Sequence, residues 1–152
     1  MAGASQGRGT RCGFGNIKMV VNITRDGDIA VVTVDNPPVN ALGQALRQGL
    51  WDAVATLDAT ADVRAVVLIC AGRTFIAGAD VTEFGKPPVP PHLPDLVDRI
   101  EGAAKPWVAA IHGSALGGGL EVAMGCRFRV ALESTALGLP EHPREEVASR
   151  PR

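Results

Sequence analysis

The fold of this chain is decided by residues 106–126, PWVAAIHGSALGGGLEVAMGC. Residues 107–111 form a short apolar run with β-formers between a proline and a glycine, which is typical of a buried strand. The glycines at 117–119 precede good helix formers, so we expect a helix whose first backbone N–H groups are uncovered and attract negative charge. Glu121 lies in the first turn of this helix among apolar neighbours, where burial of a carboxylate is costly.

Composition limits the size of the fold and the kinds of partner. A chain of 152 residues with 46% hydrophobic residues supports one ordinary core, hence one domain. The net charge of -1 favours neither nucleic acid nor a membrane surface, and a small neutral or anionic ligand fits better. Cys12, Cys70 and Cys126 have no metal-binding spacing, so we interpret them as free packing thiols in a reducing compartment. Without a long apolar run or a secretory signal, we expect a soluble cytoplasmic protein.

The first half of the chain predicts a ββαβ unit. Two β-branched runs, residues 18–24 and 29–34, flank an Asp-Gly pair and predict a hairpin. Apolar residues then recur at helical spacing from near Asn40 to near Leu57. Residues 65–71 are continuously apolar, which is typical of a strand covered on both faces. Strands alternating with helices indicate an α/β protein with a largely covered sheet.

The segment before the deciding stretch contains a turn, an extended region and a second helix. Asp80 and Glu83 have the spacing of a capping box for a short helix. Five prolines within residues 86–94 predict an extended surface segment, which we interpret as a flap. Residues 96–104 have the pattern of an amphipathic helix, and residues 127–132 that of a further strand.

Two acids and two small-residue turns suggest acid–base chemistry. Glu141 follows Glu121 by 20 residues (141 minus 121), and an out-and-back path through the strand between them would bring the two carboxylates together. Paired carboxylates in an apolar pocket can hold different protonation states, so that one gives and the other takes a proton. The N–H groups at Gly118 and in the turn at residues 77–79 would form a two-donor hole for a developing enolate.

Each feature also has a simpler interpretation. The three glycines can merely allow a helix to pack closely on a strand, and without the second acid and the second turn we would favour that. A dinucleotide-binding turn is disfavoured because Val122 occupies a Gly or Ala position and Glu121 would repel a pyrophosphate. We interpret His112 as a hydrogen-bonded residue rather than a base, and Trp107 and Phe75 as core residues.

Three blocks resemble the signatures of the enoyl-CoA hydratase/isomerase (crotonase) family. They are FIAGAD at 75–80, KPWVAAIHGSALGGGLE at 105–121 and LGLPE at 137–141. FGKPPVPPHLP at 84–94 further resembles the N-terminal hydratase/isomerase region of bifunctional fatty-acid oxidation enzymes, which combine enoyl-CoA hydratase with 3-hydroxyacyl-CoA dehydrogenase. The resemblance runs through about residues 18–141 in order and implies a crotonase-like fold of repeated ββα units, with its N-terminal part only in this chain.

The resemblance also implies a function in fatty-acid β-oxidation. The substrate would be an acyl-CoA, with hydration of a trans-2-enoyl-CoA as the reaction and isomerisation of a 3-enoyl-CoA as a second activity. No metal or redox cofactor is implied, because the coenzyme A thioester is itself the substrate. By the family pattern Glu121 and Glu141 are the catalytic acids, and the amides of Ala79 and Gly118 form the oxyanion hole. The implied substrate-binding residues are Ala77, Gly78, Ala79, Asp80, Val81, Gly117 and Gly118.

The two ends of the chain depart from the family pattern. We interpret residues 1–16 as a disordered leader, 17–142 as a partial hydratase/isomerase domain and 143–152 as a charged tail of a truncated or frame-shifted product. The family assembles into homotrimers, often stacked into hexamers, which we do not expect of a truncated chain. The competing interpretation is a non-catalytic fragment, in which the helices near residues 46–57 and 96–104 expose apolar faces and the chain aggregates.

Overall fold

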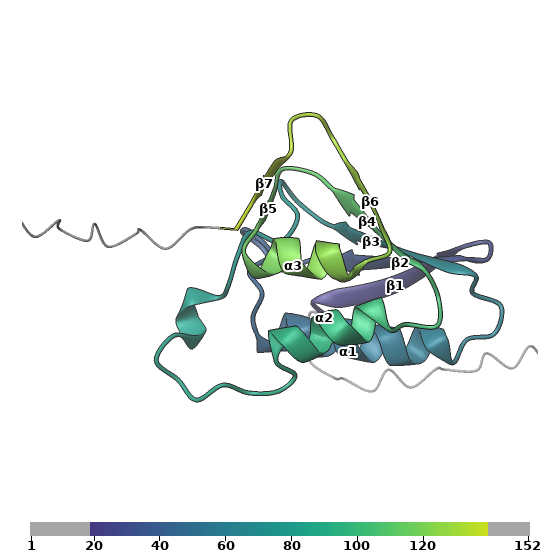
Figure 1. Ribbon diagram of the computed structural model, residues 1–152, viewed down its shortest axis with the longest axis horizontal. Coiled ribbons are helices and arrows are strands. Elements are labelled where there is room, and N and C mark those ends of the chain that lie inside the picture. Colours follow the sequence, from purple (N-terminus) through teal and green to yellow (C-terminus); the bar gives the residue numbers. More distant parts are fainter. Residues whose placement is uncertain (1–18, 140–152) are drawn as a thin grey trace, which may run out of the picture.

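The computed structural model describes residues 19–139 (Figure 1). The predicted leader at 1–16, the charged tail at 143–152 and Glu141 lie outside the described residues. Within the described part, strands and helices alternate as an α/β fold predicts. No helix of this part is long and apolar enough to cross a membrane.

The first half of the described chain forms the predicted ββαβ unit. Strands β1 (Val21–Asp26) and β2 (Ile29–Val34) pair antiparallel around Gly27, whose φ of 60° favours glycine. Helix α1 (Gln44–Asp58) follows, and β3 (Ala65–Cys70) returns parallel to β2. The hairpin, helix and strand thus form in the predicted order, although β1 extends to Asp26 instead of ending at the predicted residue 24.

Helix α1 begins at Gln44 rather than near the predicted Asn40. Asn40 has φ of 53°, in the left-handed region that interrupts a helix. Its side chain is buried, accepts a hydrogen bond from the Asn36 N–H (2.8 Å), and donates to the carbonyls of Ala71 and Thr74 (2.9 Å each). Asn40 therefore joins two loops, and the helix starts only after it.

The second half of the chain extends the sheet to the order β1-β2-β3-β4-β6. Strands β4 (Trp107–Ile111) and β6 (Phe128–Ala131) lie where the sequence predicted them, and both are added in parallel. Helix α2 (Leu93–Glu101) starts earlier than the predicted residue 96. Its first turn includes Pro94, which is tolerated because N–H groups there have no partner within the helix.

One face of the sheet carries the core. Helices α1 and α2 pack on each other, and α1 packs on the hairpin, so the apolar faces expected to lie uncovered on both helices are buried. In β3, Val66 and Leu68 are fully buried, whereas Val67 and Ile69 on the opposite face are half-buried. Complete cover of β3 on both faces is therefore wrong, because alternate residues of a strand point to opposite faces and the helical layer protects one of them.

A small second sheet lies beside the main one. Strands β5 (Ser114–Leu116) and β7 (Ala136–Gly138) pair in parallel. In Figure 1 they stand at an angle to β4 and β6, so that the two sheets form a wedge with α3 (Gly118–Gly125) across its base. The start of α3 is thereby set where β5, β7 and the segment before η1 (Val81–Glu83) meet.

Candidate active site

Close packing fixes the start of α3. Gly117 has φ of 53° and turns the chain from β5 into the helix, as the glycine run predicted. A Cβ atom at Gly119 would overlap the carbonyl oxygen of Ile76. The simpler interpretation of the glycines as packing residues therefore holds for Gly119, where any side chain would push α3 away from the strand-like segment around Ile76.

The two turns expected to supply hydrogen-bond donors lie side by side. Ala77 bridges Leu116 in parallel, with the Leu116 N–H donating to the Ile76 carbonyl (3.2 Å). Two residues further along each of these segments are Ala79 and Gly118. Neither N–H of this pair donates to another backbone group within residues 19–139. The two predicted amides thus lie just beyond the same pair of bridged segments, and neither has a backbone acceptor among the described residues.

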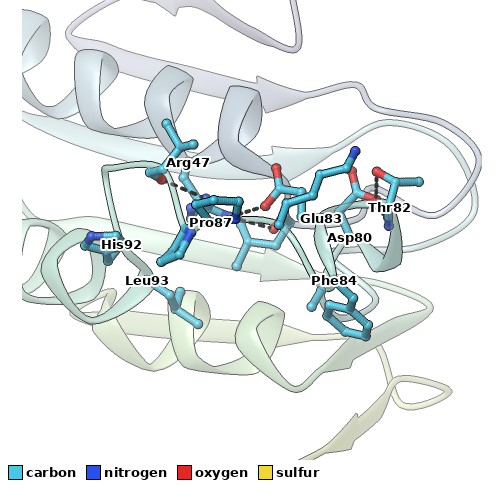
Figure 2. Close-up of a pocket in the computed structure, with 13 residues that line it drawn as sticks. Arg47, Asp80, Thr82, Glu83, Phe84, Pro87, His92 and Leu93 are labelled. Atoms are coloured by element: carbon cyan, nitrogen blue, oxygen red, sulfur yellow. Dashed lines mark hydrogen bonds and ion pairs between the residues drawn. The ribbon is translucent and has the colours of Figure 1, made fainter.

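A cavity of about 590 Å³ opens beside Ala79 (Figure 2). Its wall comes from the start of α1, from the turn that contains Asp80, from the proline-rich segment and from the first residues of α2. The lining residues are Leu42, Arg47, Ala79, Asp80, Thr82, Glu83, Phe84, Lys86, Pro87, Pro88, Val89, His92 and Leu93. Figure 2 shows Arg47 and Glu83 pointing toward each other in this wall.

Glu121 lines a second cavity of about 350 Å³, next to the first. Leu93 contributes to both cavities. An ideal Cβ built on Gly118 would lie 2.9 Å from Leu93 Cδ2, 3.0 Å from Leu42 Cδ2 and 3.9 Å from Glu121 Oε2. The Glu121 carboxylate therefore lies close to Gly118, and the side chain of Leu93, which lines both cavities, lies beside the same glycine.

Glu121 does not bear the cost of burial that its apolar sequence neighbours suggested, because its side chain is exposed. The apolar walls of its cavity come from one sequence neighbour, Met124, and from residues of α2 that include Pro94. Asp98 of α2 also lines it and adds a second acidic group, which no sequence neighbour of Glu121 predicted. The surroundings of this carboxylate are thus partly polar and open to solvent.

The chain returns toward Glu121 along the predicted out-and-back path. Strand β7 pairs with β5, and the Gly117 N–H donates to the carbonyl of Gly138 at 2.8 Å. Glu141 itself lies outside the described residues. Its pairing with Glu121 therefore stays a prediction, with the chain just before it held beside the start of α3.

The capping box expected around the 77–83 turn is half correct. Asp80 caps η1 by accepting hydrogen bonds from the Thr82 N–H (2.9 Å) and hydroxyl (2.7 Å), and these bonds lower the pKa of the Asp80 carboxyl. Glu83 does not return to Asp80. Its carboxylate accepts hydrogen bonds from the Gln44 N–H and from Arg47 (3.1 Å), because η1 lies against the start of α1. Val81 is exposed, so no contact within the structure assigns it a role.

Predictions for five other residues are confirmed, while Cys12 lies outside the described residues. His112 Nε2 lies 2.8 Å from the Gly72 carbonyl and is hydrogen-bonded, while Trp107 and Phe75 are core residues. Cys70 and Cys126 are free and buried, and burial raises the pKa of each thiol to about 12. Neither thiol is therefore available as a thiolate nucleophile near neutral pH.

Arg47 and Leu93 are site residues that the sequence did not single out. Arg47 lies on the helical pattern without any motif, and Leu93 was assigned to the extended proline-rich segment. The only sequence feature that pointed to this part of the site was the capping-box spacing of Glu83. That spacing predicted Asp80 as the partner of Glu83, whereas the structure pairs Glu83 with Arg47. Among the described residues no group of His, Cys, Asp and Glu has the arrangement of a metal site.

A model of the family described as enoyl-CoA hydratase/isomerase matches residues 24–143. The chain belongs to this family. Its similarity to a probable enoyl-CoA hydratase of Bacillus subtilis is 41% identity over 128 residues, covering 80% of this chain and 50% of the relative. A peroxisomal fatty acid beta-oxidation multifunctional protein of Oryza sativa is 44% identical over 135 residues, covering 84% of this chain and 18% of the relative.

Solved structures confirm the crotonase-like fold. The crystal structure of an enoyl-CoA hydratase/carnithine racemase from Magnetospirillum magneticum superposes with a TM-score of 0.73 at 33% identity. The superposition covers 80% of this chain and 49% of that one. Our enoyl-CoA hydratase/isomerase chain thus spans about half the length of these Bacillus subtilis and Magnetospirillum magneticum relatives.

Proposed function

We propose that this enoyl-CoA hydratase/isomerase domain hydrates trans-2-enoyl-CoA thioesters through an enolate. The observation that carries the proposal is the pairing of the segments that lead to Ala79 and Gly118, whose amides have no backbone acceptor within residues 19–139, together with the Glu121 carboxylate close to Gly118. Two N–H donors aimed at one oxygen stabilise the negative charge that develops on it. An acid close to the same point can move a proton to or from the adjoining carbon atoms.

In this proposal the thioester oxygen accepts hydrogen bonds from Ala79 and Gly118, and the turns at 77–81 and 117–118 hold the thioester. Glu121 and Glu141 orient a water molecule and remove its proton. The water oxygen bonds to C3, the C2–C3 double bond shifts its electrons to the thioester oxygen, and an acid returns a proton to C2. The product is the 3-hydroxyacyl-CoA.

Isomerisation of a 3-enoyl-CoA to the 2-enoyl form is the second candidate. It uses the same enolate but needs mainly one acid to move a proton from C2 to C4. This alternative is supported by the Glu121 carboxylate, which lies close to Gly118 and can serve as that one acid. Relatives named as multifunctional β-oxidation proteins also support it.

We further propose that the reaction requires only the thioester and water, with no metal or redox cofactor, and that nucleic acid and membranes are not partners. A protein that includes the remaining half of the family domain would form the homotrimer or hexamer. For location we propose the cytoplasm, supported by the buried free thiols Cys70 and Cys126. Imaging of a tagged protein would distinguish it from the peroxisome, which the name of the Oryza sativa relative mentions.

The test is the hydration of crotonyl-CoA by this chain extended with the part of the Bacillus subtilis relative that lies outside the match. Glu121→Gln and Glu141→Gln should each lower kcat at least about 100-fold with little change in KM, as expected for loss of an acid–base group. Glu133→Gln, which neutralises an exposed acid away from the cavities, is the control and should keep the parent rate. Parent turnover in the Glu121 variant would remove that residue from the mechanism.

The 152-residue chain alone should show little or no hydration in the same assay. Acids and donors must be held within about 0.5 Å for this chemistry, by packing that we expect from the rest of the family domain. Turnover comparable to that of the extended protein would show that residues 1–152 form a sufficient active site.

A further inference from the structure

One arginine side chain joins three separate segments of the cavity wall. Arg47 lies on α1 and its side chain is only 11% exposed. Its Nε donates to the Pro91 carbonyl (2.7 Å), and one terminal nitrogen donates to the Val89 carbonyl (3.1 Å). The other terminal nitrogen donates to the Leu42 carbonyl (3.2 Å) and the Glu83 carboxylate (3.1 Å). The planar guanidinium with its fixed fork of donors is suited to such a junction (Figure 2).

The segment containing Leu42 holds the Ala79 amide. Leu42 bridges Ala79 in parallel, and the Leu42 N–H donates to the Gly78 carbonyl at 2.9 Å. The carbonyl of the same Leu42 is bonded to Arg47. Arg47 thus fixes, from the outside, the strand-like segment against which the turn of Ala79 is paired.

The proline-rich segment reaches the Gly118 amide. Its Val89 and Pro91 carbonyls are bonded to Arg47, and Leu93, two residues after Pro91, is the first residue of α2. The side chain of Leu93 meets Gly118, as does the side chain of Leu42. The segment that we interpreted as a free flap is therefore tied to α1, and its position determines one wall around Gly118.

Glu83 fixes the guanidinium from the other side. Helix α1 has Gly43 as its N-cap, which offers no capping side chain, and Glu83 instead accepts a hydrogen bond from the Gln44 N–H. A carboxylate at this position also interacts favourably with the helix dipole. A Cβ on Gly43 would lie 2.9 Å from Asp80 Oδ2 and 3.2 Å from Glu83 Oε1, so the glycine leaves room for both acids.

We propose that Arg47, anchored by Glu83, is a positioning residue that sets the relative placement of the Ala79 and Gly118 amides. It acts through the Leu42 and 89–93 segments and does not touch the reacting atoms. Without the guanidinium, two carbonyls of the proline-rich segment lose their donor and both segments lose a common support. The catalytic consequence rests on the proposed function, whereas the structural part can be tested without it.

The chain offers a matched control in Arg25. Its guanidinium also pairs with an acid, Asp62 (3.1 Å), and donates to the Gly27 carbonyl (3.0 Å). Arg25 lines neither of the two cavities. Arg25→Met therefore removes the same kind of interaction at a place where the proposal expects no effect on the amides.

The first experiment measures amide hydrogen exchange in the 152-residue chain. Arg47→Met and Arg47→Lys should each raise exchange at the Leu42 and Lys86 amides at least about 10-fold, since lysine cannot reproduce the fork. Both amides are hydrogen-bonded in the parent, to Gly78 and Glu83 carbonyls. Arg25→Met should keep the parent rates there. Parent exchange in both Arg47 variants would overturn the proposal.

The second experiment measures crotonyl-CoA hydration in the extended protein. Arg47→Met should lower kcat at least about 10-fold relative to Arg25→Met, at temperatures well below the Tm of each variant, with KM changed less than kcat. Glu83→Gln should show the same pattern, and the double variant should lose less than the product of the two single losses. If Arg47→Met exchanged faster but kept the kcat of the parent, the proposal that Arg47 positions the Ala79 and Gly118 amides would be overturned.

The two experiments separate the possible failures. If the parent and Arg25→Met both lack turnover, the proposed function fails, and exchange alone decides whether Arg47 holds the two segments. If Arg47→Met does not fold, Arg47→Lys and Glu83→Gln carry the test, because they keep a cation or an acceptor at the same positions.

Discussion

The sheet of this enoyl-CoA hydratase/isomerase domain differs sharply between its α1-covered side and its β6 end. In β2 and β3, alternate residues are fully buried under the helical layer. In β6 every residue is exposed, although Phe128 and Val130 are as apolar as Val66 and Leu68. The comparison teaches that an apolar strand pattern predicts a strand reliably but does not by itself predict what covers it.

Several exposed apolar residues lie on or directly after β6 and β7, and we call this set the β6–β7 patch. It consists of Phe128, Val130, Leu132, Leu137 and Leu139. Both strands carry it, and β6 is also an edge of the main sheet within residues 19–139. Apolar residues at an exposed edge strand favour association with other chains. The uncovered surface expected on the helices thus lies on strands instead.

The largest loss of stability should follow from removing a buried side chain on the α1-covered side of the sheet. Leu68→Ala removes a fully buried side chain from β3 and should lower the free energy of unfolding by about 2–5 kcal/mol. Urea unfolding followed by circular dichroism measures it. A loss below about 1 kcal/mol would mean that the α1-covered core is not closed, and the contrast with β6 would disappear.

The pH dependence of stability above pH 9 should show whether the buried core includes both Cys70 and Cys126. Burial raises the pKa of Cys70 and Cys126 from 9.0 to about 12. Between these values the folded thiols keep protons that unfolded thiols release, so the stabilisation is complete below pH 9 and is lost as pH rises toward 12.

The expected slope is about 1.4 kcal/mol per pH unit for each thiol. Unfolding free energies measured between pH 9 and pH 12 should fall with this slope for each of the two cysteines. Cys126→Ala should halve the contribution, since Cys126 lies just before the exposed β6 but is itself buried. If the pH dependence of the unfolding free energy were unchanged in Cys126→Ala, Cys126 would be solvent-exposed like the residues of β6.

The smallest change in stability should come from the β6–β7 patch. Phe128→Ser combined with Val130→Ser should alter the unfolding free energy by less than about 0.5 kcal/mol per site, because both side chains are exposed. Sedimentation velocity should nevertheless show less self-association than in the parent chain. Val39→Ser, at an exposed valine outside the patch, is the control and should leave association unchanged. Equal association in all three proteins would show that the patch is not the contact surface.

The sequence predicted the local elements well because their patterns depend on near neighbours. The Asp-Gly hairpin, the apolar face from Leu46 to Leu57 and the strand at Trp107–Ile111 each follow from backbone preference and periodicity over a few residues. The glycines before Glu121 likewise predicted an open helix start. The ordered motif blocks also indicated the family, which the match over residues 24–143 confirms.

Tertiary structure alone decided the surroundings of these elements. The exposure of Glu121, the start of α1 after Asn40, and the junction of Arg47 with Glu83 all depend on groups far away in the sequence. Spacing along the chain specifies which way a backbone turns, because that is set by sterics within a few residues. Which acid finds which donor, and which strand face meets a helix, is set by packing in three dimensions, where segments such as residues 42, 83 and 91 become neighbours.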